Sequence, residues 1–192
     1  NNISYSPAES LKQKIENGEI IITTPGGFNA SFSFPAQQII DRYNSEEHNL
    51  SLISDLTLTI PAEETENGFG LTAAPDLLMV KTSELNDFFL KNRLPDNKTS
   101  FAASYDSEKQ NYTFASMRPY IVDLLGKASI SADDVDFTLV PVNLVKVTDS
   151  DYYNNSTTYV TKCLPYTLKP TMTLLHTDKA LIVFSFSSQK FD

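Results

Sequence analysis

Hydrophobic and polar residues alternate along much of the chain, which is the pattern of strands with one buried face. The clearest case is 28–34, where Phe and Ala alternate with Asn and Ser. Successive side chains of a β-strand point to opposite faces, so this segment predicts a half-buried strand. The segment 52–60 alternates in the same way, but its register changes near Ile53, which predicts a β-bulge.

Other segments are rich in β-branched and aromatic residues and have strand length. Pro25-Gly26-Gly27 and Pro95-Asp96-Asn97 separate some of them as turns. Pro141 lies inside the longest segment and predicts that this strand runs along a sheet edge. The further strands are predicted at 19–24, 77–81, 99–105, 112–114, 135–147, 159–164, 171–176 and 180–187.

A few short helices interrupt the strands. Ser6 and Glu9 form a capping box around Pro7, and Gly18 is a C-terminal stop, which predicts a helix between them. Ser116 is predicted to cap a later helix that ends at Gly126. Helices are also predicted at 35–43 and 83–91.

The order of these elements favours a mainly β fold. Strands follow one another without a regular strand–helix–strand alternation, which argues against a parallel doubly wound sheet. The sequence predicts an antiparallel, jelly-roll-like β-sandwich of nine or ten strands with three or four short peripheral helices. One domain over residues 1–192 is the simplest organisation, and the alternative is a boundary in an acidic loop at 63–70.

Composition narrows the function classes. The net charge is −9, from 24 acidic and 15 basic residues, and an acidic surface repels nucleic acid. The longest apolar stretches, such as Leu181–Phe186, are far shorter than the roughly 18 residues of a membrane span. Cys163 is the only cysteine, so no intrachain disulfide forms.

The abundance of Asn, Ser, Thr and Tyr is typical of exported bacterial proteins. Because the chain begins with Asn-Asn, we interpret it as a mature or trimmed fragment whose export signal lies upstream.

Several segments resemble a known family. LLMVKTSELNDFF, LPDNKTSFAASYD, YTFASMRPYIVDLL and DVDFTLVPV are similar to the later part of bacterial envelope lipoproteins with domain of unknown function 4270. FNASFSFP, ISDLTLTIPAE and LKPTMTLLHTDKALIVFSFS resemble further strands of the same family. The resemblance implies a β-rich, exported, lipid-anchored protein of a Gram-negative bacterium, and it implies no catalytic residues. The lipid-bearing cysteine of the family is absent from this chain, and Cys163 lies inside a predicted strand. The family's usual chain is also longer than this one.

Motifs for catalysis are lacking. His48 and His176 fall in polar loops, and neither accompanies a Gly-x-Ser-x-Gly nucleophile turn. Cys163 lies among hydrophobic residues, so we expect a buried small side chain rather than a nucleophile. Two histidines and one cysteine without paired spacing do not predict a zinc site. We therefore expect a protein that is not an enzyme and carries no cofactor.

Calcium is the alternative to a metal-free protein. Hard cations take six to eight oxygen ligands, and three acidic clusters supply such oxygens, although none has EF-hand spacing. Ordinary solvated loops explain the same clusters. The candidate ligands are Glu63, Glu64 and Glu66, then Asp133, Asp134 and Asp136, then Asp149 and Asp151.

Tyrosines are the candidates for ligand binding. The candidates are Tyr43, Tyr105, Tyr152 and Tyr153, whose rings are suited to stacking on sugars. The alternative is that Tyr105 packs within the sheet and that Tyr152 and Tyr153 hold a loop in place. We expect a non-catalytic recognition domain that binds a glycan or a surface protein. We place it in the bacterial envelope, at the outer membrane or cell surface, with membrane contact only through an upstream lipid anchor. The alternatives are a structural component of cell adhesion or surface-fibre assembly, and a hydrolase with paired carboxylates.

Overall fold

The computed structural model describes residues 9–45, 51–64, 70–150 and 156–188 and confirms a mainly β, antiparallel fold. The strands in this part are β1 (Ile20–Thr24), β2 (Ala30–Ser33), β3 (Ser51–Glu64), β4 (Asp76–Lys81), β5 (Ser100–Asp106), β6 (Asn111–Phe114), β7 (Asp136–Ser150), β8 (Ser156–Pro165), β9 (Thr171–Leu175) and β10 (Leu181–Ser188). The helices are α1 (Glu9–Glu16), α2 (Ala36–Ser45), α3 (Leu85–Leu90), α4 (Arg118–Leu125) and α5 (Ala132–Val135), with 3-10 turns η1 (Thr82–Glu84) and η2 (Thr177–Lys179).

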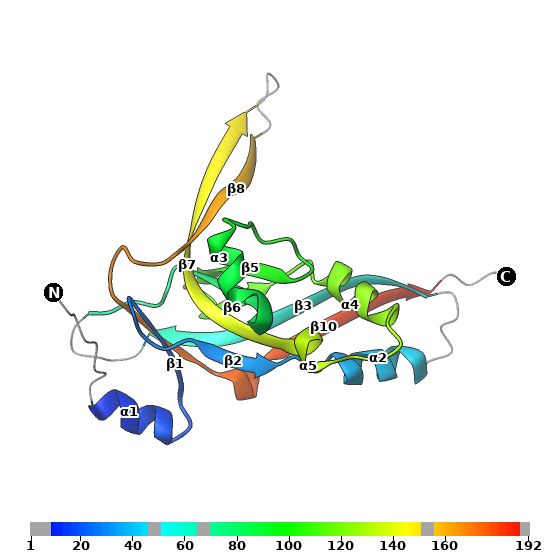
Figure 1. The fold of residues 1–192 in the computed structure, drawn as a ribbon, viewed down its shortest axis with the longest axis horizontal. Coiled ribbons are helices and arrows are strands. Elements are labelled where there is room, and N and C mark those ends of the chain that lie inside the picture. The colour runs from blue at the N-terminus through cyan, green and yellow to red at the C-terminus, as the bar shows by residue number, and fades with distance from the viewer. Residues whose placement is uncertain (1–8, 46–50, 65–69, 151–155, 189–192) are drawn as a thin grey trace.

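The sheet curls until its two ends meet. Its strand order is β1-β9-β3-β6-β5-β4-β7-β2, with every neighbouring pair of strands antiparallel. The terminal strands β1 and β2 are consecutive in sequence and contact each other, and the Thr23 amide donates to the Phe28 carbonyl (3.1 Å) at their junction. The result is a nearly closed, sandwich-like barrel (Figure 1).

Aromatic rings fill the centre of this barrel. The Tyr120 ring of α4 meets Phe34, Phe101 and Phe137 edge-on, with centroids 5.6, 6.0 and 5.5 Å away. Edge-to-face pairs contribute about 0.5–1.5 kcal/mol each beyond the burial of their area. Because Phe34 directly follows β2 and the other rings come from β5, β7 and α4, one cluster joins four parts of the chain. The same core contains residues that precede 65–69, such as Ala62, and residues that follow it, such as Ala74.

A second, smaller cluster covers the outer face of the sheet. Leu77 and Met79 of β4 point into the main core, whereas Leu78 and Val80 point outward and pack with Phe88 of α3. Both faces of β4 are therefore buried, which explains why its sequence is a continuous apolar run without alternation.

β7 changes partner along its length, which corrects the prediction for Pro141. This residue pairs with Leu77 in the interior of the sheet, not along an edge. Its carbonyl accepts the Tyr166 amide (3.0 Å) on the flank where the pairing of β2 ends at Leu139 and that of β8 begins at Val142. The missing N–H of proline thus falls in the gap between two partners, where it costs no ladder hydrogen bond.

Ser6 of the first predicted cap lies outside the described residues, and the cap of α4 differs from the prediction. Gly18 lies at φ +90 just after α1, as expected for a glycine stop, and Gly126 follows α4. Met117, not Ser116, stands at the cap position of α4, and no side chain caps it. Ser116 has φ +60 and lies in the short connection between β6 and α4.

Two strand pairs extend beyond the barrel. The hairpin of β7 and β8 projects from the body as an arm, and residues 51–59 at the start of β3 pair with β10 in a ribbon that runs in another direction, to the right in Figure 1. The predicted bulge is confirmed, because Ser54 is skipped between the pairs Asp55–Ser185 and Ile53–Phe186. None of the described helices has both the length and the apolar character to cross a membrane.

Candidate binding site

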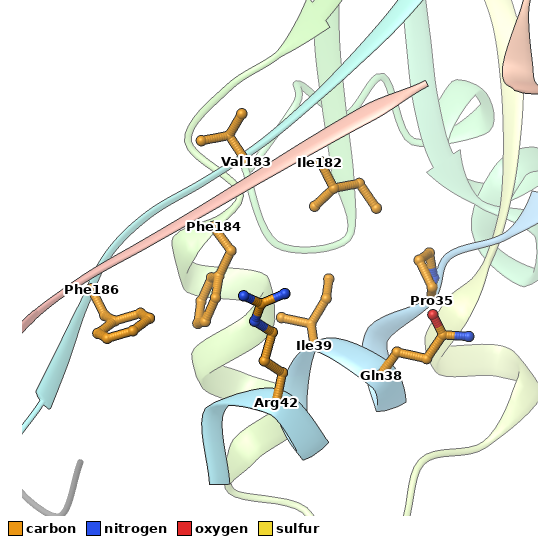
Figure 2. A pocket seen from close by; sticks show the side chains of 8 residues that line it. All are labelled: Pro35, Gln38, Ile39, Arg42, Ile182, Val183, Phe184 and Phe186. Carbon is orange, nitrogen blue, oxygen red and sulfur yellow. The ribbon is translucent and has the colours of Figure 1, made fainter. Parts of the chain in front are cut away.

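A hollow of about 600 Å³ lies between α2 and β10. Figure 2 shows its two walls, a helix face below and a strand above, with Ile182, Phe184 and Phe186 on the side of the helix and Val183 pointing away from it. We call it the α2–β10 groove. The residues that line it are Pro35, Gln38, Ile39 and Arg42 from the helical side and Ile182, Val183, Phe184 and Phe186 from the strand.

The helical wall follows from the periodicity of α2. Pro35, Gln38, Ile39 and Arg42 are spaced i, i+3, i+4 and i+7, so they form one stripe along the helix. Ile40 on the adjacent face is buried in the core. α2 contacts α4, and α4 contacts β3, so the helix is fixed against the barrel with its groove-lining stripe left accessible.

The strand wall follows from the alternation of β10. Ile182, Phe184 and Phe186 are half-buried on the side of α2, whereas Leu181 and Val183 are 59% and 49% exposed on the other face. Among the described strands, β10 pairs with β3 alone, so the second edge of Leu181–Ser185 has no strand partner within the described residues. Natural edge strands are usually protected by charges, proline or bulges. LIVFSFSS contains no charge and no proline, and the bulge at Ser54 of β3 lies opposite the junction after Ser185.

The groove is apolar apart from two side chains. Arg42 is the one charged residue among those that line it, and it forms no ion pair with a described residue. Gln38 supplies an amide. A guanidinium without an ion-pair partner among the described residues favours a carboxylate in the molecule that occupies the groove.

Of the two predicted ligand-binding tyrosines that the structure describes, Tyr43 lies next to this groove and Tyr105 does not. The Tyr43 ring packs edge-on against Phe184, with centroids 6.2 Å apart. Tyr105 lies elsewhere: its hydroxyl donates to the Ala62 carbonyl (3.2 Å), and its ring lies 5.2 Å from that of Tyr112. Burial, helped by nearby Glu64 and Glu63, raises the pKa of Tyr105. Tyr152 and Tyr153 fall outside the described residues.

The predicted acidic loop at 63–70 is wrong at its start, because Glu63 and Glu64 belong to a strand. β3 runs through Glu64, because Glu63 and Glu64 pair with Leu174 and Thr173 of β9. Glu63 lies 3.4 Å from the His176 ring, and Glu64 accepts the Ala73 amide at 3.4 Å. Glu66 lies outside the described residues.

The other two clusters have structural partners. The buried carboxylate of Asp134 closes a capping box with Ser131 and accepts from Lys127 (2.5 Å) and Lys81 (3.4 Å). Asp136 begins β7 opposite Ser33, and Asp149 pairs with Thr157 in the arm. Asp133 is exposed on α5, and Asp151 lies outside the described residues.

These placements give calcium no support. In the part of the chain that the structure describes, no group of three or more His, Cys, Asp and Glu side chains is placed to hold a metal ion.

Cys163 and His176, the other residues considered for catalysis, lie in different parts of the fold. Cys163 is buried in the outer cluster beside α3, and burial raises the pKa of its thiol to about 12. His176 lies next to Glu63 at the start of η2. The predicted burial of Cys163 is confirmed, and a protonated buried thiol is a poor nucleophile.

The sequence did not predict one polar cluster, which consists of Asp76, Ser104 and Lys146. The Ser104 hydroxyl donates to the nearly buried carboxylate of Asp76 (2.6 Å), and the Lys146 ammonium donates to that hydroxyl (3.1 Å). These residues come from three strands, so no local motif indicates them. The lysine also lies 4.0 Å from Asp76, so the cluster compensates the charge of a carboxylate in the sheet.

Comparison with known proteins found no matching family model, no matching curated protein and no matching solved structure. The fold and the groove therefore define only a class: a mainly β domain with an open strand edge beside an apolar groove.

Proposed function

We propose that this chain is a non-catalytic recognition domain that binds a protein partner in the α2–β10 groove. The observation that carries the proposal is the juxtaposition of an unprotected strand edge with an apolar groove. Exposed apolar surface beside an open edge is characteristic of protein interaction sites. A glycan is the weaker candidate, because sugar sites combine stacking rings with several polar groups, and this groove offers Gln38 and Arg42 alone.

The setting we propose is the bacterial envelope, as part of an exported lipoprotein anchored upstream of this chain. The resemblance to the family with domain of unknown function 4270 supports this setting, together with a composition rich in Asn, Ser, Thr and Tyr. The acidic net charge of −9 also argues against a nucleic-acid partner.

Two neighbouring glutamines provide the test. Gln37 and Gln38 are both exposed on α2, but only Gln38 lines the groove. The purified domain is screened against a phage-displayed library of random peptides and on a glycan array. We expect enriched peptides whose binding is lost in Gln38→Trp, which fills the groove, and kept in Gln37→Trp. Glycan binding without peptide binding, or peptide binding that Gln38→Trp leaves intact, contradicts the proposal.

A structural role in adhesion or surface fibres is the second candidate, and the projecting arm favours it. Beyond the barrel, β8 pairs only with β7 among the described strands, so its other edge is open as well. Open edges associate by strand addition. Sedimentation over a wide concentration range tests this role. Self-association that is lost when residues 146–160 of the arm are deleted supports it. A protein that stays monomeric at every concentration contradicts it.

A further inference from the structure

The orientation of the backbone along β10 identifies which groups face the open edge. The Leu56 carbonyl accepts the Met117 amide (3.0 Å), so the backbone groups of Leu56 point away from β10. Phe184 lies opposite Leu56 in the register. In an antiparallel ladder, the two residues of such a pair both turn their N–H and C=O groups away from each other. The backbone groups of Phe184 therefore face the open edge.

The same alternation extends to Ile182. It lies opposite Leu58, which shares the orientation of Leu56 and pairs on its far side with Phe114 of β6. Within the described part of the chain no strand pairs with the outward N–H and C=O groups of Ile182 and Phe184, so these groups can pair with a new strand. The side chains of the same two residues line the α2–β10 groove. Backbone pairing and side-chain recognition are offered at one place.

We infer that the partner is an extended segment of another protein that adds to β10 as a further strand, an inference that rests on the proposed function. The segment pairs with Leu181–Ser185, the stretch before the bulge, so it contributes about five residues in strand conformation. Its alternate side chains enter the groove between β10 and α2.

The side chains of this segment follow from the lining of the groove. Apolar residues at alternate positions match Ile39, Ile182 and Phe184. A carboxylate on the same face matches Arg42, whose charge has no partner among the described residues. A second copy of this chain is a poorer occupant, because two chains of net charge −9 repel each other.

The first experiment measures amide exchange. The probe is an acetylated seven-residue peptide in which Thr alternates with Val, Ile and Glu, added at about ten times its Kd. Exchange of the Ile182 and Phe184 amides slows about tenfold, whereas the Val183 amide, which already faces Thr57 of β3, is unchanged. A peptide of the same composition with the alternation scrambled has no effect. Unchanged exchange at Ile182 and Phe184 overturns the inference.

Two variants of one residue separate backbone pairing from side-chain contact. Ile182→Pro removes the N–H that faces the open edge while leaving the bonds between β10 and β3 in place. Ile182→Val keeps that N–H with a side chain of similar size. We expect Ile182→Pro to abolish peptide binding and Ile182→Val to weaken it less than about threefold. Equal effects of the two substitutions overturn strand addition, and circular dichroism confirms that both variants are folded.

A charge exchange tests the role of Arg42. We expect Arg42→Glu to lower the affinity for the Glu-containing peptide about tenfold. The same variant should bind a peptide with Lys in place of Glu as tightly as the original chain binds the Glu-containing peptide. Lys162→Glu on the exposed part of β8 is the control and changes neither affinity. Failure of the Lys peptide to restore binding overturns the carboxylate part of the inference.

These results also distinguish the inference from the proposed function. If selected peptides bind in the groove while Ile182 and Phe184 keep their exchange rates, protein recognition stands and strand addition fails. If no peptide binds at all, both fail.

Discussion

At the scale of single residues, Asp134 shows how a predicted metal ligand is used for folding. Its buried carboxylate accepts hydrogen bonds from Lys127, Lys81 and both the amide and the hydroxyl of Ser131. The hydrogen bond from Lys127 is the largest cause that lowers the pKa of Asp134 far below its ordinary value of 3.8, against the opposing effect of burial. The carboxylate thus joins α5 to β4 and to the segment after α4.

Asp134→Asn tests this role. Removing one member of a buried charge pair leaves two lysines uncompensated, so we expect a loss of about 2–4 kcal/mol in the free energy of unfolding at pH 7. Urea denaturation measures the loss. Asp133→Asn, which changes the exposed neighbouring carboxylate, is the matched control and stays within about 0.5 kcal/mol of the original chain.

The pH dependence of the same variant has a definite sign. Because the folded pKa of Asp134 is lowered, its contribution is fully present above the unfolded pKa, near 4, and is lost as the pH falls toward the folded value. The difference in stability between the original chain and Asp134→Asn therefore shrinks as the pH falls below about 4. A difference that stays constant down to the acid transition contradicts this account.

Cys163 gives a second prediction at this scale. Burial, and to a smaller extent Asp76, raise the pKa of the thiol to about 12. At pH 8 we expect a chromogenic disulfide reagent to modify the folded chain at least about a hundredfold more slowly than the chain in denaturant. A chain with Cys163→Ala and Tyr159→Cys, which moves the thiol to an exposed position of β8, reacts rapidly when folded. Fast labelling of folded Cys163 contradicts its burial beneath α3.

At the scale of elements, most strands and helices were predictable because they are encoded locally. The alternation at 28–34 produced β2, the run at 77–81 produced β4, and the register change near Ile53 produced the bulge at Ser54. The groove was not predictable, because it joins Arg42 of α2 to Phe184 of β10 through packing that no local period records. Two local signals did exist: the stripe Pro35 to Arg42 and the uncharged alternation of LIVFSFSS.

The arm formed by β7 and β8 leads to a prediction about local stability. Val147 and Tyr159 face each other across the hairpin and remain 42% and 49% exposed, so little apolar area is buried there. A two-stranded ribbon without a covered face is marginally stable in water. We expect amides in 146–150 and 156–160 to exchange much faster than those of β4, whose residues 76–80 are all buried. Equal protection of the arm and β4 indicates that a partner copy covers the arm.

At the scale of the whole molecule, closure of the sheet depends on the junction between β1 and β2. Thr23 donates its amide to Phe28 and accepts the Phe28 amide on its hydroxyl (3.0 Å), so the chain folds back tightly over Pro25–Gly27. This turn brings the first strand of the sheet order next to the last one. The hydroxyl chain of Ser31, Thr138 and Thr82 then connects β2 to β7 and η1, with oxygens 3.0 and 2.9 Å apart.

Gly27 makes that closure feasible, and its substitution is the test at this scale. A Cβ at Gly27 would overlap both the hydroxyl and the carbonyl oxygen of Thr23, so the turn must open to accept it. We expect Gly27→Ala to lower the free energy of unfolding by about 1–3 kcal/mol.

The matched control is Gly126→Ala, because a Cβ there meets its nearest atom at an ordinary 3.5 Å and φ is −80. Thermal and urea unfolding measure both variants, and Gly126→Ala should be neutral or slightly stabilising. Adding Thr23→Ala to Gly27→Ala removes the overlap with the hydroxyl but not with the carbonyl, so it rescues stability only in part. Equal stabilities of the two alanine variants would show that the barrel closes without this turn.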